Sequence, residues 1–257
     1  LAESNCMKFF RSSFLVCLLS TVYLSCKHDT NLFHEVSSEN SGIHFSNTIV
    51  ENDSINPIDL TNIYNGGGVG IGDFNNDGLQ DIYFTGNMVS NKLYLNRGKL
   101  KFEDITNIAK VSGDGKWCRG VAVVDINNDG WMDMYICASM DKDPEKRKNL
   151  LYVNQGLDKN KLPVFKEMAA AYGLDDTSHS TMASFFDYDN DGDLDMFLLS
   201  NSFKPIGSFN LQQNERNIRD SMGGHKLFRN DGGHFTDVSA AAGIYGSVIG
   251  FGLGVTV

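Results

Sequence analysis

DFNNDGLQD, residues 73–81, carries an acidic or amide side chain at positions 1, 3, 5 and 9 and a glycine at position 6, and it leads directly into the apolar run IYFTG. The pattern returns as DINNDGWMD at residues 125–133 and as DYDNDGDLD at residues 187–195. We call these segments loops 1, 2 and 3. Their recurrence, at intervals of 52 and 62 residues, indicates a repeat architecture.

The similarity extends to the segments around each loop. A segment rich in small apolar residues precedes the loop (GVGIGDF, GVAVVDI, ASFFDY), and a segment that is apolar on both faces follows it (DIYFTGN, DMYICAS, DMFLLSN). A third segment reads KLYLNRG, LLYVNQG or KLFRNDG, and a fourth reads FEDIT, FKEMA or FTDVS. Four short strands per unit, stacked so that both sheet faces are buried, predict an all-β fold, a β-propeller of four-stranded blades.

Both ends of the repeat region match part of a blade. Residues 32–43, LFHEVSSENSGI, resemble a fourth strand, and residues 250–257, GFGLGVTV, resemble the first strand before an Asp loop. We therefore expect residues 27–257 to be the N-terminal part of a propeller, a fragment truncated before the next loop. It would contain about three blades plus an orphan strand at each end.

The loops have the chemistry of a calcium site. Ca²⁺ takes six to eight oxygen ligands at roughly 2.3–2.6 Å, and alternate side chains converge on one ion only where the backbone curls, which a glycine permits. Each loop supplies four side chains and the carbonyl of its seventh residue, so we expect about three Ca²⁺ sites. The expected ligands are Asp73, Asn75, Asp77, Leu79 and Asp81; Asp125, Asn127, Asp129, Trp131 and Asp133; and Asp187, Asp189, Asp191, Asp193 and Asp195.

Other readings of the loops fit less well. The bidentate Glu at position 12 of an EF-hand is replaced by Phe84, Ile136 or Leu198, and a β segment follows in place of a helix. Zinc would require Cys or His ligands. NNDG is also a good turn sequence, but a turn alone does not need the carboxylates at positions 1 and 9, which repel each other without a cation.

The acidity of the chain is concentrated in these loops. They contain eleven carboxylates, and without them the formal net charge of −10 would be about +1. This distribution argues against a nucleic-acid partner and for cations. The run NGGGVGIG, residues 65–72, matches neither a GxGxxG motif nor a P-loop, and we interpret its small residues as close packing of the innermost strand.

The repeats resemble FG-GAP/VCBS repeats, the calcium-binding blades of integrin α-subunit propellers. They also closely resemble bacterial lipoproteins of the cartilage acidic protein-like group, which carry a C-terminal ASPIC/UnbV domain. The resemblance covers residues 32–257 and implies an extracellular, calcium-stabilised, seven-bladed propeller used for binding. The further blades and the ASPIC/UnbV segment are not among these residues.

The N-terminal region reads as a processing segment. From Met7, MKFFRSSFLVCLLSTVYLSC has a basic start and a short apolar stretch that ends at Cys26, and it resembles a bacterial lipoprotein signal. We expect residues 1–26 to be upstream residues and signal peptide, Cys26 to be the lipidated residue, and the protein to be a secreted or cell-surface lipoprotein of a bacterium. An ordinary signal peptide is the alternative. Cys118 and Cys137 could form a disulfide or remain two packed thiols.

The expected function is non-catalytic binding or adhesion to a glycan or protein partner, with a membrane association only through the lipid anchor. The alternatives are a carbohydrate-active enzyme, such as a propeller-type polysaccharide lyase, and a scaffold for a missing domain. The connections between second and third strands, opposite the Asp loops, are enlarged at residues 141–148 and 201–224. Aromatic and Arg residues are frequent anchors of recognition, so the expected partner-binding residues are Phe203, Phe209, Arg216 and Arg219.

Overall fold

The computed structural model describes residues 32–60, 62–202 and 215–256. The chain divides into two units, residues 1–36 and residues 37–257. Residues 32–36, the described part of the first unit, contain no helix or strand. The signal segment and Cys26 lie outside the described residues, and within the described part no helix is both long enough and apolar enough to cross a membrane.

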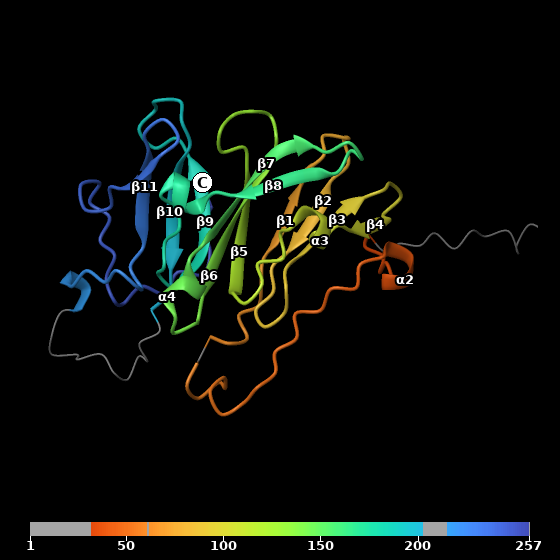
Figure 1. Ribbon diagram of the computed structural model, residues 1–257. Coiled ribbons are helices and arrows are strands. Elements are labelled where there is room, and N and C mark those ends of the chain that lie inside the picture. The colour runs from red at the N-terminus through yellow and green to blue at the C-terminus, as the bar shows by residue number, and fades with distance from the viewer. Residues whose placement is uncertain (1–31, 61, 203–214, 257) are drawn as a thin grey trace, which may run out of the picture. The chain divides into compact units, whose positions relative to one another are not determined.

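Within the second unit, the strands form three four-stranded antiparallel sheets, each in simple up-and-down order (Figure 1). The predicted all-β fold with propeller-like blades is thereby confirmed. Blade 1 contains β1 (Val69–Gly72), β2 (Asp81–Phe84), β3 (Lys92–Asn96) and β4 (Phe102–Asp104). Blade 2 contains β5 (Trp117–Val124), β6 (Asp133–Ser139), β7 (Leu150–Leu157) and β8 (Pro163–Glu167). Blade 3 contains β9 (Ser180–Phe186), β10 (Asp195–Ser200), β11 (Lys226–Asn230) and β12 (Phe235–Asp237).

The two end segments differ from the expected orphan strands. Residues 32–43 form no strand; they contain the helical turn α2 (Ser38–Ser41). Similar helical turns, α3 (Thr106–Ala109) and α5 (Ala169–Tyr172), follow the fourth strands of blades 1 and 2. Residues 250–256 make only an isolated bridge, between Asn201 and Phe251. A strand is defined by a hydrogen-bonded neighbour, and neither segment pairs with one over more than a single residue.

The core consists of two clusters on the two faces of blade 2. Every residue of β6 is buried. Met134 and Ile136 join the cluster shared with blade 1, whereas Tyr135 and Cys137 join the cluster shared with blade 3. This alternation confirms that the second strand is apolar on both faces because a sheet is stacked on each side of it.

The same alternation decides between the two expectations for the cysteines. Cys118 lies in the blade 1 cluster and Cys137 in the blade 3 cluster, on opposite faces of the sheet, and both are free thiols. Burial raises the pKa of Cys118 to about 11, which leaves it as an unreactive thiol.

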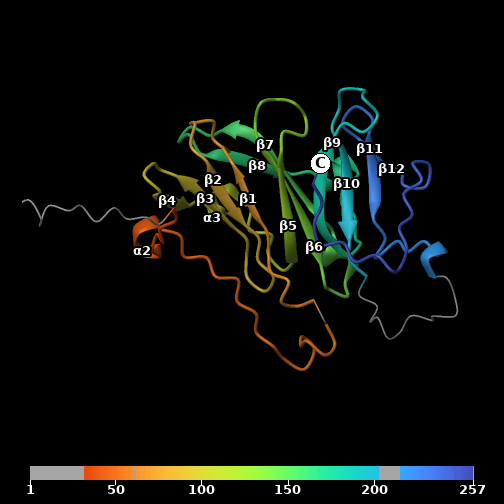
Figure 2. The same cartoon turned by 180° about the vertical axis from the view of Figure 1, so that it is seen from behind.

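The innermost strands explain the glycine-rich run. A Cβ at Gly70 or Gly72 would lie 2.9 or 2.8 Å from a methyl of Val123, so blade 2 packs directly on the backbone of β1. Figure 2 shows the sheets following one another in chain order, with β1, β5 and β9 as their first strands. Close packing between the sheets thus accounts for the small residues of NGGGVGIG, without a phosphate-binding loop.

Candidate metal centres

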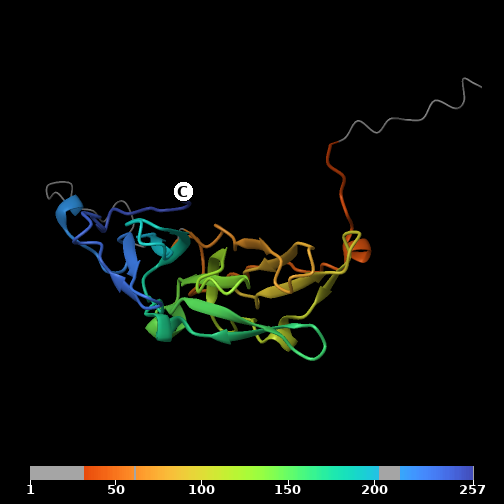
Figure 3. The ribbon, with the colours of Figure 1, turned by 90° about the horizontal axis from the view of Figure 1, so that it is seen from above.

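The three Asp loops lie on one edge of the blades. Loop 1 connects β1 to β2, loop 2 connects β5 to β6, and loop 3 connects β9 to β10. They project together at the top of Figure 1, and Figure 3 looks down onto them. The connection from β6 to β7, which contains α4 (Pro144–Arg147), lies on the opposite edge (Figure 1). The structure therefore brings the loops to one edge, as alternating antiparallel connections require.

The first aspartate of each loop is bonded to the turn that it encloses. Asp73 accepts the backbone N–H of Asp77 on Oδ1 at 3.1 Å and that of Gly78 on Oδ2 at 2.7 Å. Gly78 has φ 86° and Asn76 has φ 53°, both in the left-handed region, so the chain curls tightly around the carboxylate. Loops 2 and 3 repeat the two bonds: Asp125 accepts from Asp129 (3.0 Å) and Gly130 (2.8 Å), and Asp187 from Asp191 (3.2 Å) and Gly192 (3.1 Å).

The middle of each loop also follows one pattern. The position-5 aspartate accepts the N–H of the seventh residue at 2.9 Å, in the pairs Leu79 to Asp77, Trp131 to Asp129 and Asp193 to Asp191. In loops 1 and 2 the position-3 amide donates to that aspartate, from Asn75 at 3.0 Å and from Asn127 at 2.9 Å. The seventh residues lie in the turn, and their role as carbonyl ligands remains a prediction.

The ninth residue is a buried carboxylate that joins the loop to the sheet. Asp81 is fully buried; its Oδ2 accepts the N–H of Phe74 at 2.9 Å and its Oδ1 accepts the N–H of Asn96, on β3, at 2.8 Å. Asp133 bonds in the same way to Ile126 (2.9 Å) and Asn154 (2.7 Å), and Asp195 to Tyr188 (2.9 Å) and Asn230 (2.8 Å). One side chain thus ties the loop to the third strand of its blade.

Burial makes two of these carboxylates, those of Asp81 and Asp133, costly to ionise. It raises the pKa of Asp81 and of Asp133 to about 6, against the two backbone hydrogen bonds that each accepts. The neighbouring carboxylates Asp73 and Asp77, or Asp125 and Asp129, add to the rise. A bound cation would offset both burial and like-charge repulsion.

Loop 3 differs from the others at position 3. Asp189 replaces the asparagine, and oxygen atoms of Asp187, Asp189 and Asp195 lie within 4.8 Å of one another, a group able to hold a metal ion. Asp189 is exposed, and its pKa is raised by slight desolvation and by the neighbouring carboxylates Asp191, Asp195 and Asp187. Carboxylate and amide oxygens are the ligands that Ca²⁺ prefers, so the donor set of all three loops fits that ion.

One residue of each blade that supports the loop was missed from the sequence. Asn96 donates from Nδ2 to the carbonyl of the eighth loop residue, Gln80, at 3.0 Å, and its Oδ1 accepts the N–H of Gly98 at 2.9 Å. Asn154 and Asn230 repeat these bonds, to the carbonyls of Met132 (3.2 Å) and Leu194 (3.2 Å) and from the N–H of Gly156 (3.1 Å) and Gly233 (2.8 Å). The asparagine in LYLN, LYVN and LFRN was the available signal.

The predicted partner-binding residues are only partly described. Phe203 and Phe209 lie outside the described residues. Arg216 is exposed in the short 3-10 helix η2 (Glu215–Asn217). Arg219 donates to the carbonyl of Ile244 at 2.9 Å and lies 4.7 Å from the ring centroid of Tyr245, so it also packs within its own chain. Their role in recognition remains a prediction.

A comparison with protein families matches residues 73–136 to the FG-GAP-like repeat. This segment is an FG-GAP-like repeat. It runs from the first residue of loop 1 through the rest of blade 1 and loop 2 into β6. A comparison with curated proteins found no match to the chain. The hydrogen bonds described above carry the loop pattern of the FG-GAP-like repeat on into loop 3.

Proposed function

We propose that this chain is an extracellular, calcium-binding β-propeller module that binds a glycan or protein partner without catalysing a reaction. The observation that carries the proposal is that one loop geometry occurs three times, each time with a carboxylate at position 1, another at position 5 and a buried one at position 9. Such a concentration of oxygen ligands is costly unless a cation is bound.

The expected role of Ca²⁺ is structural. The position-9 carboxylate already connects each loop to its third strand, and a cation on the same carboxylate would hold the first two strands in register with it. The rigid blades would then support the connections on the opposite edge, where a partner binds. Loops on a rigid scaffold are common sites of recognition.

Calcium titration tests this proposal. Millimolar Ca²⁺ should raise the melting temperature of the purified chain, with a Kd of roughly 10⁻⁴–10⁻³ M as in other extracellular modules. Asp129→Ala should reduce the rise, whereas Asp53→Ala, which removes an exposed carboxylate outside the loops, should not. A melting temperature that does not respond to millimolar Ca²⁺ would refute calcium binding.

We further propose the finer identity suggested by the sequence: a bacterial lipoprotein of the cartilage acidic protein-like, ASPIC/UnbV-associated group, anchored through Cys26. What supports it is the FG-GAP-like repeat together with the signal-like segment before Cys26. In cells that express the precursor, Cys26→Ser should move the protein from the detergent phase to the aqueous phase. Unchanged partitioning would refute the anchor.

The alternative of a carbohydrate-active enzyme needs two free carboxylates that face each other across a cavity. The carboxylates at positions 1 and 5 of loops 1 to 3 accept backbone hydrogen bonds within their own turns. The cavity on the opposite edge, described next, is lined by one carboxylate, Asp141. No observation in the described part of the chain favours catalysis over binding.

A further inference from the structure

A cavity of about 290 Å³ opens on the edge opposite the Asp loops. Its walls come from residues 55–60, from the β2–β3 connection at residues 87–90, from the start of β5 and from the β6–β7 connection at residues 140–141. The partner-binding residues predicted from the sequence belong to a different connection of this edge, residues 201–224. The cavity lies between blades 1 and 2 and the segment that precedes blade 1.

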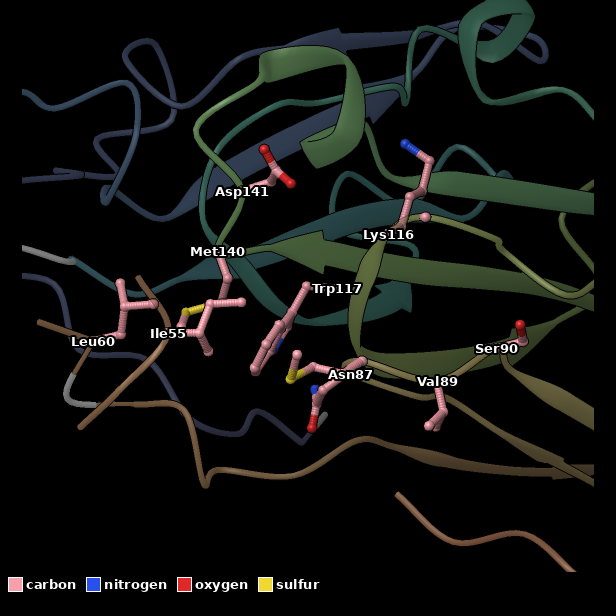
Figure 4. Close-up of a pocket in the computed structure, with 11 residues that line it drawn as sticks. Ile55, Leu60, Asn87, Val89, Ser90, Lys116, Trp117, Met140 and Asp141 are labelled. Atoms are coloured by element: carbon pink, nitrogen blue, oxygen red, sulfur yellow. The ribbon is translucent and has the colours of Figure 1, made fainter. Parts of the chain in front are cut away.

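Five of the large side chains of the cavity wall are apolar, those of Ile55, Leu60, Met88, Trp117 and Met140, and Lys116 is the large polar one. Figure 4 shows Trp117 extending toward Met140 and Ile55, with Leu60 beyond them. The amine of Lys116 and the carboxylate of Asp141 point away from this group in the same view. Met88 is 37% exposed although its neighbour Asn87 is buried. The centre of the cavity is therefore an apolar surface, and two methionines, whose side chains are flexible, line it on two sides.

The polar side chains that line the cavity use their donors within the protein. Burial also lowers the pKa of Lys116, which lies among main-chain carbonyl groups. The bonds are Lys116 Nζ to the carbonyls of Glu145 (2.8 Å) and Lys148 (2.9 Å), Asn87 Nδ2 to the carbonyl of Cys118 (2.9 Å), and Ser90 Oγ to Asp114 Oδ1 (2.7 Å). A sugar needs donors and acceptors for its hydroxyl groups, and this wall directs few of them inward.

We propose that this cavity binds an aromatic side chain of a protein partner. A cavity of roughly 150 Å³ lined by aliphatic and aromatic groups holds a benzene molecule, so the larger volume accommodates a Phe, Tyr or Trp ring together with its connecting atoms. The ring would contact Trp117 and the two methionines, contacts that favour aromatic over aliphatic groups. The inference rests on the proposed binding function and selects protein over glycan as the partner.

NMR titration with N-acetyl-L-phenylalaninamide tests the proposal, because the chain has only two tryptophans. The indole N–H resonance of Trp117, assigned with Trp131→Phe, should shift saturably with half-saturation on the order of 1 mM, as expected of a fragment-sized ligand. Trp131, in loop 2, serves as the internal control and should not shift. N-acetyl-L-alaninamide and glucose should leave both resonances in place.

Two variants in one segment separate the cavity from general surface effects. Ile55→Asp places a charge in the wall and should weaken the response at least tenfold. Ile58→Asp makes the same change three residues away, at a side chain that is 91% exposed, and should have no effect. Leu60→Asp is the second wall variant should Ile55→Asp fail to fold.

The outcomes are distinct from those of the calcium proposal. Failure of Ca²⁺ to raise the melting temperature leaves the Trp117 titration valid, provided the chain is folded. The cavity proposal is overturned by the absence of a saturable Trp117 shift, by an equal shift in a folded wall variant, or by a response to glucose in place of the aromatic probe.

Discussion

The interface between blades 1 and 2 and the interface between blades 2 and 3 differ at the Asp-loop edge. At the first, Asn76 of loop 1 donates to the carbonyl of Gly130 in loop 2 at 3.1 Å, and Asn154 of blade 2 donates to the carbonyl of Phe74 at 2.9 Å. Loops 1 and 2 are therefore connected directly. These two hydrogen bonds link the candidate metal sites of neighbouring blades.

At the second interface the corresponding space is open. Asn230, the equivalent of Asn154, is bonded within its own blade, to Leu194 and Gly233. A cavity of about 580 Å³ lies there, lined by residues of loops 2 and 3 and by Tyr172. The comparison teaches that loops of the same pattern need not be connected equally: the amides of Asn76 and Asn154 cross the first interface, whereas the bonds of Asn230 stay within its own blade.

The largest expected effect concerns the buried position-9 carboxylate that ties each loop to the third strand of its own blade, which we call the clamp. Asp133→Ala would leave the buried N–H groups of Ile126 and Asn154 without an acceptor, at roughly 1–3 kcal/mol for each unsatisfied group. We expect the free energy of unfolding to fall by about 3 kcal/mol in urea denaturation, with or without Ca²⁺. Asp129→Ala, at an exposed position of the same loop, should cost clearly less without Ca²⁺. Equal losses would contradict the clamp.

A second test concerns coupling between the metal sites. If the bonds across the first interface transmit order, Asp77→Ala in loop 1 should weaken Ca²⁺ binding at loop 2 several-fold. The matched change in loop 3, Asp191→Ala, should leave loop 2 unaffected because no such bond joins those loops among the described residues. Calorimetric titration resolves the sites. Equal effects of the two variants would show that the open interface transmits order as well.

The third prediction concerns pH without calcium. The folded pKa of Asp81 and Asp133 is about 6, above the ordinary value of 3.8, so the folded chain binds these protons more tightly than the unfolded chain. Their contribution to stability is present below about pH 4 and is lost as the pH rises to about 6. Urea denaturation in EDTA should show this fall, and Asp81→Asn with Asp133→Asn should remove it. Saturating Ca²⁺, which competes with the protons, should reverse the slope.

The smallest expected effect tests a single bridge. Asn76→Ala removes the bond from loop 1 to loop 2 and should lower the free energy of unfolding by about 0.5–1.5 kcal/mol. Asn128→Ala is the matched control, since Asn128 occupies the same loop position with nearly the same φ, 56° against 53°. The difference between the two variants isolates the bridge from the backbone cost of alanine at positive φ. No difference would mean that the bridge contributes nothing to stability.

Much of the fold could be read from the repeated pattern, because each blade has the same order of apolar segments and turn residues. The strands of blades 1 to 3 lie where the aligned segments placed them, and the loops occupy one edge. The prediction of an orphan strand at each end was wrong, since residues 32–43 contain a helical turn and residues 250–256 make a single bridge. Strand pairing needs a neighbour that local sequence does not specify.

The candidate sites divide in the same way. Alternating oxygens and a glycine are local features, so the nine-residue pattern alone predicted which side chains share a turn. The asparagines of the third strands were overlooked because they meet the loops only through the folded sheet, at sequence distances of 16, 22 and 36 residues. The opposite-edge cavity was invisible for the same reason: its wall combines residues from 55 to 141.

The sequence by itself determined the blade repeat, the position of the Asp loops and the oxygen chemistry of their side chains, because these depend on residues within one hairpin. Only the tertiary structure decided which loops are bonded to each other, that Cys118 and Cys137 lie on opposite faces, and where an apolar cavity remains open. The physical reason is that stacking and long-range hydrogen bonds depend on how whole sheets pack, and equivalent residues in successive blades meet different neighbours.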